Sequence, residues 1–322
     1  MTEPLRTLSA TVKSSWHDFL DAFEPLRPEL YRYCRYLTKN PWDAEDLAQD
    51  TLARAFVTLG THHHAPPPNP RAWLFRVASN LWIDRARRAR DIGEPQAATH
   101  APDPRVTREA AGTLIGKLSP QERAAVVLKD VFDLSLEEVA MALSTTPGAV
   151  KAALHRGRGK LTENESDQPR VATPAALDAF CAAFNARDID RMTALLLDTS
   201  LVEIVGVVTE YGPEEARDPY SGSFAGMLSP LTLDERGGVG EKYLEGYEGG
   251  APRTEIRIHR GEPVLLFWYR HTDGDVVRAV ARLDVQGDHI TRLRNYFFTP
   301  DVIAEVAREL DVPFCVNGYR YW

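Results

Sequence analysis

The chain has 322 residues, which is too long for one small module and enough for two or three compact domains. Hydrophobic residues make up 43% and charged residues 26%, a balance that fits a folded protein and excludes wholesale disorder. No apolar run approaches the roughly 20 residues that cross a bilayer, and the charged N-terminus does not resemble a signal peptide. We therefore expect a cytoplasmic protein with no membrane contact. The three cysteines lie far apart and predict neither a disulfide framework nor a zinc site: Cys34, Cys181 and Cys315.

Net charge differs between the two halves of the chain. Residues 1–165 carry 22 Lys and Arg against 21 Asp and Glu, a net charge of +1, whereas residues 166–322 carry 16 against 25, a net charge of −9. Inside the first half, residues 69–90 contain six arginines and one acid, and residues 147–161 contain four basic residues and no acid. Basic segments attract phosphates, while an acidic half repels DNA. The pattern predicts a positioned DNA contact in the first half.

Two segments without apolar periodicity, rich in Pro, Ala or polar residues, are interpreted as linkers. They lie at 92–106 and 163–173 and separate three blocks and a tail. The expected domains are residues 15–91, 107–162 and 174–312, and the tail is the aromatic segment 313–322.

The first two blocks carry apolar residues at spacings of three and four, which predicts helices throughout. In the first block, Asn40-Pro41 and Asn69-Pro70 interrupt this spacing and mark the starts of two further helices. In the second block, Ser119 and Ser135 each begin a Ser-x-x-Glu capping box, a pattern that starts a helix at the serine. Both blocks are expected to be all-α.

The third block begins with two amphipathic helices after Thr173-Pro174 and then changes its period. Apolar residues then alternate with a period of two in five segments, which predicts strands. The alternation places His259 on the face opposite Ile258 and leaves open whether the histidine meets solvent. Helices followed by strands predict an α+β domain.

Residues 136–161 fit a helix-turn-helix, because two short amphipathic helices are separated by Ser144-Thr145-Thr146. The second helix carries basic and small residues on its outer face, as a helix that enters the major groove requires. These outer residues are Ala149, Lys151, Ala152, His155, Arg156 and Arg158. The alternative is an ordinary helical hairpin with a solvated charged face.

Two other segments suit contact with macromolecules. One helix face carries Asp43, Asp46, Gln49 and Asp50, and it is either a solvated face or a protein-binding face. In residues 69–90, arginines stand beside three aromatic residues, a composition that suits single-stranded nucleic acid because unpaired bases stack on rings. These aromatics are Trp73, Phe75 and Trp82. The alternative is that both tryptophans belong to the core.

Three segments together resemble the bacterial extracytoplasmic-function (ECF) sigma factors of the sigma-70 family. They are DAEDLAQDTLARAF (43–56), NPRAWLFRVASNLWIDRARRAR (69–90) and LSPQERAAVVLKDVFDLSLEEVAMALSTTPGAVKAALHRGRGKL (118–161). Their order, their spacing and the Pro-rich linker between the last two all agree with that family. The resemblance implies two all-α sigma domains, region 2 and region 4, and a protein that binds core RNA polymerase and directs it to promoters.

The resemblance also assigns a partner to each segment. It implies that helix 43–56 docks on the clamp helices of core RNA polymerase and that 69–90 opens and reads the −10 element. The helix-turn-helix would read the −35 element, with linker 92–106 threading the polymerase between them. The residues implied for polymerase contact are Asp43, Glu45, Asp46, Gln49 and Asp50. Those implied for the promoter side of the first domain are Asn80, Asp84, Arg85, Arg87 and Arg88.

The third block resembles the SnoaL-like branch of the NTF2-like fold, a cone of curved antiparallel sheet around helices, through the segment AFCAAFNARDIDRMTALL (179–196). This fold hosts enzymes that use Asp, His or Tyr as acid or base, but no spacing here selects a catalytic pair. We therefore expect no catalytic residue, no metal site and no cofactor. The expected role is regulation through intramolecular contact with the sigma domains.

Two alternatives stand beside the sigma factor. One is a helix-turn-helix regulator with a ligand-sensing NTF2-like domain, which does not explain the acidic helix or the segment of arginines and aromatics. The other is an NTF2-like enzyme fused to a DNA-binding module. Binding to core polymerase is expected of a sigma factor and of neither alternative, so it distinguishes the three hypotheses.

Overall fold

The computed structural model of the chain describes residues 3–61, 67–91, 118–159, 174–218, 222–231 and 241–319. These residues form two compact units, Met1–Asp167 and Gln168–Trp322. The two predicted linkers and the last three residues of the predicted tail lie outside the described residues. Within the described ranges, no helix has both the length and the apolar character to cross a membrane.

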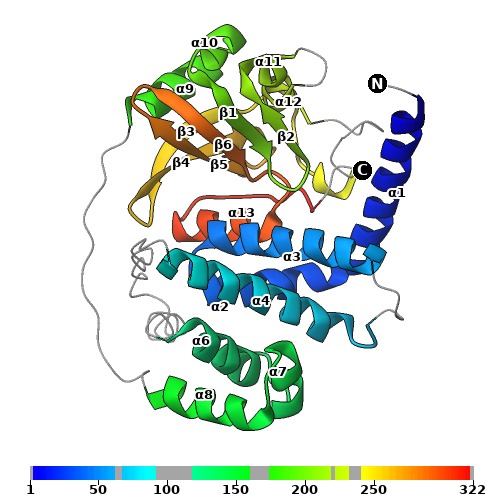
Figure 1. Cartoon of the computed structure of the whole chain (residues 1–322). Helices are drawn as coiled ribbons and strands as arrows, with labels where there is room; N and C mark the ends of the chain where they lie inside the picture. Colours follow the sequence, from blue (N-terminus) through cyan, green and yellow to red (C-terminus); the bar gives the residue numbers. More distant parts are fainter. Residues whose placement is uncertain are drawn as a thin grey trace. The chain divides into compact units, whose positions relative to one another are not determined.

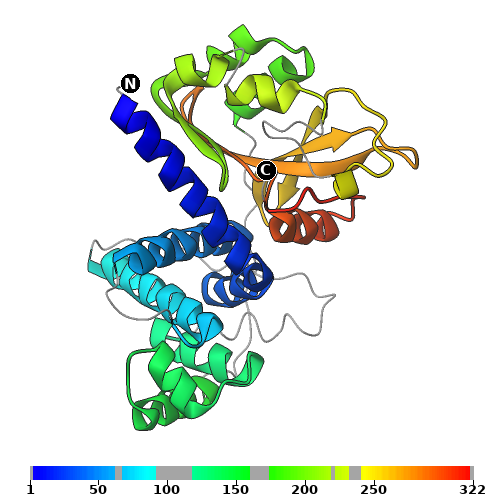
Figure 2. The same ribbon diagram turned by 90° about the vertical axis from the view of Figure 1, so that its right-hand side faces the viewer.

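The first unit opens with a group of helices (Figures 1 and 2): α1 Glu3–Phe23, the 3-10 helix η1 Glu24–Leu26, α2 Arg27–Thr38, α3 Pro41–Thr61 and α4 Pro70–Asp91. Two asparagines cap the helices that follow the predicted breaks. The Asn40 Oδ1 accepts from the Trp42 N–H at 2.9 Å, and the Asn69 Oδ1 accepts from the Ala72 N–H at 3.0 Å. The side-chain oxygens thus satisfy backbone donors that have no partner inside the helix.

Aromatic side chains build the core between these helices. Phe19 of α1 packs against Phe23 and Phe56, with ring centroids 4.5 and 5.5 Å apart. Trp73 and Phe75 are 9% and 1% exposed, so both belong to this core and neither is free to stack on a base. Trp82 is half-buried and is the one ring of that series that keeps some surface.

A second group of helices contains α6 Pro120–Val126, the π-helical turn η2 Val127–Val131, α7 Leu136–Ala142 and α8 Pro147–Gly159. Both predicted capping boxes are formed. The Ser119 hydroxyl accepts from the Glu122 N–H at 3.3 Å, and the Ser135 hydroxyl accepts from the Glu138 N–H at 3.1 Å. In each box the glutamate carboxylate accepts a hydrogen bond from the serine N–H. The prediction of all-α architecture is confirmed for both groups.

The two helical groups pack on one another inside the first unit. The ring of Phe132, which follows η2, meets the rings of Tyr33 and Phe75 edge-on, at centroid distances of 5.7 and 5.1 Å. Arg123 of α6 donates to the Leu37 carbonyl at the end of α2, and its guanidinium lies 5.6 Å from the Trp82 ring centroid. Burial lowers the pKa of Arg123 to about 10.

The second unit is an α+β domain, as predicted. Its helices are α9 Ala175–Asn185, α10 Ile189–Thr193, α11 Gly212–Arg217, α12 Ser223–Leu228, the 3-10 helix η3 Glu241–Tyr243 and α13 Pro300–Glu309. Its strands are β1 Leu196–Ile204, β2 Val208–Tyr211, β3 Arg253–His259, β4 Glu262–Tyr269, β5 Val276–Gln286 and β6 His289–Asn295. They form one sheet in the order β2-β1-β6-β5-β4-β3.

The sheet is mixed, which corrects the expectation of a wholly antiparallel one. Strand β6 returns beside β1 and runs parallel to it, whereas all other neighbouring strands are antiparallel. The main core lies between α9 and one face of the sheet, where Phe180 and Phe184 pack with Phe267. On the other face, α13 lies against the sheet (Figure 1).

The contact with α13 decides the orientation of His259. Its ring is 2% exposed, and its Nε2 lies 2.7 Å from an oxygen of Glu309 on α13. Ile258, on the opposite face, is 46% exposed because it lies near the end of an edge strand. Alternation alone does not predict this, since it says nothing of which helix covers which face.

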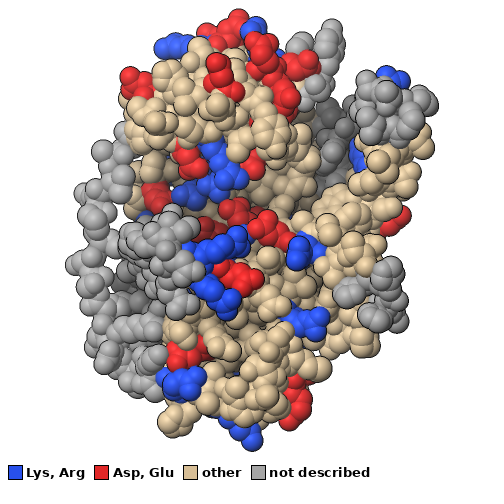
Figure 3. Space-filling model, in the orientation of Figure 1, with Lys and Arg blue, Asp and Glu red and all other residues tan. Residues whose placement is uncertain are grey.

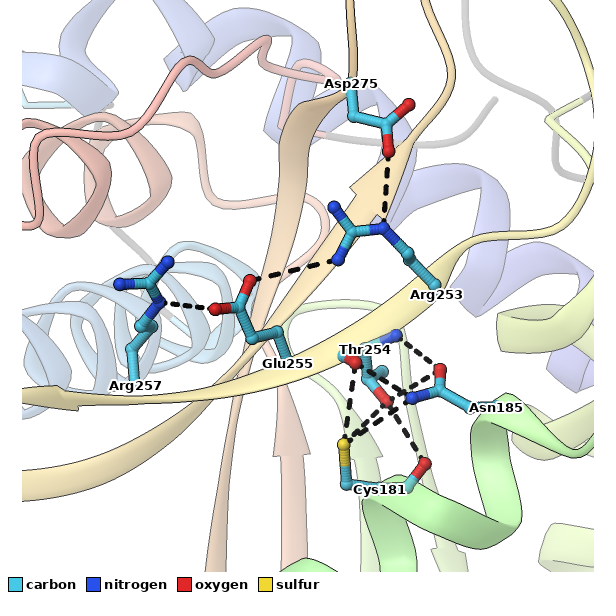
Figure 4. Close-up of polar contacts among 7 residues, drawn as sticks. All are labelled: Cys181, Asn185, Arg253, Thr254, Glu255, Arg257 and Asp275. Atoms are coloured by element: carbon cyan, nitrogen blue, oxygen red, sulfur yellow. Dashed lines mark hydrogen bonds and ion pairs between the residues drawn. The ribbon is translucent and has the colours of Figure 1, made fainter.

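The end of α9 closes part of the outer edge of β3 (Figure 4). The Asn185 side chain accepts from the Thr254 N–H at 2.7 Å and donates to the Thr254 carbonyl at 2.9 Å. Glu255 pairs with Arg257 at 2.7 Å on the same strand. Side-chain capping and charge are common means of keeping an edge strand from pairing with other chains.

The described part of the predicted tail packs on its own domain. The Val277 N–H donates to the Pro313 carbonyl at 2.9 Å, and the Cys315 N–H donates to the Val277 carbonyl at 3.0 Å. The Tyr319 hydroxyl donates to Asp301 of α13 at 2.6 Å. Residues 313–319 therefore continue the fold of this domain.

Candidate functional site

The outer face of α3 presents acidic residues while its inner face is buried. Asp43 and Asp50 are exposed, and Asp46 and Gln49 are half-buried. The opposite face is formed by Leu47 and other residues packed against α2 and α4. Four of the five residues predicted for polymerase contact therefore share one accessible face.

Glu45 departs from that prediction. Its side chain is 1% exposed and forms an ion pair with Arg27, the first residue of α2. The same carboxylate oxygen accepts from the Gln49 amide at 2.8 Å. Because the carboxylate is buried and bonded within the domain, it does not reach the surface that the other acidic residues form.

The predicted promoter side of α4 is exposed except at one residue. Asn80, Asp84, Arg87 and Arg88 are exposed, and Arg87 lies 3.8 Å from Asp84. Arg85 instead forms an ion pair with Asp50 of α3, and its side chain is 31% exposed. The acidic face of α3 and the basic side of α4 therefore meet at this pair.

Trp82 lies on the same helix, near the second helical group. Its indole N–H is buried and has no hydrogen-bond partner among the described residues. The Arg123 guanidinium covers part of the ring. Of the three aromatics in this segment, only Trp82 combines partial exposure with a position beside the exposed arginines of α4.

Helices α7 and α8 form the predicted helix-turn-helix. Val139 of α7, Leu143 directly after it, and Val150 and Leu154 of α8 are buried. The Thr146 hydroxyl accepts from the Ala149 N–H at 3.2 Å and caps α8. The outer residues Ala149, Lys151, Ala152, His155, Arg156 and Arg158 are all exposed.

Two of these outer residues have partners inside the unit. The Arg156 Nε donates to the buried carboxylate of Glu122 at 3.2 Å. Arg158 forms a two-point ion pair with Asp130 of η2, its Nε lying 3.0 Å from the nearer oxygen, and this hydrogen bonding raises the pKa of Arg158. Lys151 has no polar side-chain contact among the described residues, so α8 carries one free cation and two paired ones.

Sequence reasoning missed the residues that hold the predicted ones in place. Arg27, Glu122 and Asp130 lie 18 to 34 positions from their partners, and no local pattern marks them. Only the Ser-x-x-Glu motif gave a signal, because it marked Glu122 as a capping residue. The motif did not predict that Glu122 also accepts a hydrogen bond from Arg156.

Two side chains of the second unit that the fold could offer as acid or base, Glu203 and His271, have structural partners. Glu203 accepts from the Arg292 Nε at 2.6 Å, and His271 Nε2 lies 3.2 Å from a guanidinium nitrogen of the fully buried Arg278. Asn295 is buried, and its Oδ1 has no hydrogen-bond partner in the described part of the chain. Among the described residues, no three His, Cys, Asp or Glu side chains gather as a metal site requires.

Comparison with known proteins agrees with this arrangement. The family model for Sigma-70 region 2 matches residues 22–92, and the model for Sigma-70 region 4 matches residues 108–161. The ECF RNA polymerase sigma factor SigW of Bacillus subtilis is 30% identical over 169 residues, which cover 46% of this chain and 89% of SigW. The chain belongs to the ECF RNA polymerase sigma factors.

The likeness of this sigma factor to some relatives continues past region 4. The ECF sigma factor SigG of Mycobacterium tuberculosis is 28% identical over 317 residues, covering 86% of this chain and 80% of SigG. The crystal structure of SigJ from the same organism covers 86% of this chain and 95% of its own at 21% identity, with a TM-score of 0.32. The assignment of the chain to this family rests on its sequence.

As an ECF sigma factor, the protein binds core RNA polymerase and directs transcription initiation at promoters. The family itself is not catalytic. Its region 2 contains α3 and α4, and its region 4 contains α6 to α8.

Proposed function

We propose that the outer face of α3 docks on the clamp helices of core RNA polymerase. The contacts we assign are Asp43, Asp46 and Gln49, with Asp50 at the margin because it also holds Arg85. The observation that carries this proposal is an acidic, accessible face on a helix whose opposite face is packed in the core. Such a helix presents charge to a partner without giving up its own packing, and charge complementarity guides the encounter.

The test reverses one charge in the middle of this face. Asp46→Arg should raise the dissociation constant for core polymerase by about 30-fold or more, since a charge at a desolvated contact is typically worth ~2–5 kcal/mol. Asp18→Arg makes the same change at an exposed residue of α1, outside the face, and should bind like wild type. Fluorescence anisotropy of the labelled full chain measures both. Equal affinity of the Asp46→Arg and Asp18→Arg variants for core polymerase would contradict the docking assignment.

We infer that α4 and α8 are the promoter-binding elements. On α4 the residues we assign to the −10 element are Asn80, Asp84, Arg87 and Arg88, with Trp82 as a stacking surface. On α8 we assign Ala149, Ala152 and His155 to base edges and Lys151 to phosphate in the −35 element. Arg85, Arg156 and Arg158 already pair with carboxylates inside the unit, so they contact DNA beside those pairs or in exchange for them.

We propose that the C-terminal domain regulates the sigma domains by contact and not by chemistry, and that the protein acts in the cytoplasm with core polymerase. The chain from 166 to 322 has a net charge of −9. Exposed acids lie over α10 and α11, one of them, Asp190, paired with Arg217: Asp188, Asp190, Glu214 and Glu215 (Figure 3). A short tether gives an effective concentration of about millimolar order, at which even a weak contact is occupied.

Run-off transcription with core polymerase tests this regulation. The full chain is compared with a chain that ends at Asp167, the boundary of the first unit, at equal protein concentration and with no small molecule added. We expect the shorter chain to change promoter-dependent transcription at low salt and to differ less at high salt, because screening weakens an acidic contact. Identical transcription at both salt concentrations would rule out intramolecular control.

A further inference from the structure

Glu45 is a buried carboxylate directly beneath the acidic face of α3. Of its neighbours in sequence, Ala44 is buried in the core and Asp46 is half-buried on the outer face. The Glu45 side chain points inward toward α2. There it meets Arg27, whose side chain is only 8% exposed. A carboxylate in such a place is tolerated only when it is paired and hydrogen-bonded, which both contacts provide.

A hydrogen bond from Gln49 connects the buried pair to the outer face of α3. The Gln49 Nε2, one helical turn after Glu45, donates at 2.8 Å to the oxygen that Arg27 also contacts. No other hydrogen bond of the Gln49 side chain is found within the described residues. One N–H and the Oε1 of the amide are therefore left for a partner. The hydrogen bond to Glu45 fixes the direction in which they point.

We propose that Glu45 is a positioning residue for polymerase binding: held by Arg27, it orients the Gln49 amide on the outer face of α3. This inference rests on the proposed function, that the outer face of α3 docks on core polymerase. A glutamine on a free helix surface samples several rotamers, and fixing one of them in advance reduces the entropy lost on binding. Glu45 thus contributes to binding without touching the polymerase.

A double-mutant cycle on the full chain tests the inference. The first change, Arg27→Met with Glu45→Leu, replaces the buried pair by apolar residues of similar size, which avoids leaving one charge unpaired. The second change is Gln49→Ala. We expect each change alone to weaken binding to core polymerase by roughly 3- to 10-fold, the range of one well-placed hydrogen bond. With Gln49→Ala already present, replacing the pair should weaken binding no further, because its effect acts through Gln49.

A conservative variant separates positioning from packing. Glu45→Gln combined with Arg27→Met keeps an oxygen that accepts from the Gln49 amide and leaves no charge unpaired, so it should retain most of the affinity that the apolar pair loses. Circular dichroism melting of all variants verifies the fold. If the apolar pair weakens binding equally with and without Gln49, or does not weaken it at all, the positioning role is overturned.

The docking assignment and the positioning role fail in different ways. If Asp46→Arg and Gln49→Ala both bind like wild type, the docking face is wrong and the inference falls with it. If Asp46→Arg weakens binding while the cycle finds no coupling between the pair and Gln49, docking stands and only the inference falls. Coupling, together with recovery of affinity in the variant that carries Arg27→Met and Glu45→Gln, supports both.

Discussion

The basic residues of α8 differ in whether their charge is already paired inside the protein. Arg156 and Arg158 are bonded to Glu122 and Asp130, so part of their charge and hydrogen-bonding capacity is already used inside the unit. Lys151 has no such partner among the described residues, and its charge is available at once. Charged residues on one helix face are therefore unequal as DNA contacts, even where all are exposed.

Lys151→Ala should weaken promoter binding by the holoenzyme and reduce the slope of log affinity against log salt by about one, the loss of one phosphate contact. Arg158→Ala should change this slope less and lower the thermal stability of the chain instead, since it removes the bond between α8 and η2. A salt titration by fluorescence anisotropy measures the slopes. A larger loss of slope for Arg158→Ala would contradict the assignment.

His271 gives the C-terminal domain a pH dependence of predictable sign. Burial, reinforced by the charge of Arg278, lowers the pKa of His271, while Asp273 and Glu248 act in the opposite direction. A group with a lowered pKa in the folded state stabilises the fold above its ordinary pKa, about 6.5, and this contribution is lost as the pH falls. Stability of this domain should therefore decrease below about pH 6.5.

His271→Gln should flatten that dependence, because glutamine keeps an acceptor for Arg278 but does not titrate. Hydrogen exchange of β4 and β5 peptides, wild type against variant at each pH from 7 to 5, measures it locally. Burial alone would raise the pKa of Glu309, but hydrogen bonds from His259 and Arg260 lower it to about 2, so this carboxylate does not titrate in the window. Parallel pH profiles for wild type and variant would refute the role of His271.

Phe132 makes several of the aromatic contacts that join the two helical groups of the first unit. Phe132 is 6% exposed and packs with rings from α2 and α4, and the guanidinium of Arg32 lies 5.5 Å from its centroid. The neighbouring Val131 is 42% exposed. Phe132 therefore buries far more apolar surface between regions 2 and 4 than Val131 does.

Phe132→Ala should lower the free energy of unfolding of the first unit by about 3 kcal/mol, the scale for removing a buried phenylalanine ring. Val131→Ala, the matched control, should change it by less than ~0.5 kcal/mol, as expected of an exposed position. Urea denaturation followed by circular dichroism gives both values. Equal effects would mean that the rings around Phe132 do not hold the helical groups together.

At the scale of the whole molecule, the chain combines a nearly neutral sigma unit with an acidic α+β unit. The described part of the aromatic tail belongs to the second unit. Asn317 donates to the Arg278 carbonyl at 2.6 Å and accepts from the Arg278 Nε at 2.9 Å. The tail thus satisfies a buried cation that has no acidic partner among the described residues.

A chain that ends at Asp311 should therefore have a less stable C-terminal domain, because Arg278 loses its bonds to Asn317 and the start of β5 loses its bonds to Pro313 and Cys315. A chain that ends at Tyr319 keeps these bonds and should melt like wild type. Limited proteolysis and thermal melting distinguish the two. If both chains melt alike, the tail contacts contribute nothing to the fold.

Local patterns in the sequence determined the helices, both capping boxes, the helix-turn-helix and the α+β layout of the last domain. Each depends on residues within a few positions of one another, such as Ser119 with Glu122, and short-range geometry is enough to predict them. The family resemblance further located the acidic helix and the basic segments. These are the parts of the site that a sequence carries by itself.

Only the tertiary structure decided which predicted residues are available. Glu45 and Asp46 are adjacent acids, yet one is buried against Arg27 and the other stays on the surface. His259 is buried because α13 packs on its face of the sheet, and Arg158 is paired because η2 brings Asp130 beside α8. In each case the partner comes from a distant part of the chain, and the free energy of burying or pairing a charge depends on that partner.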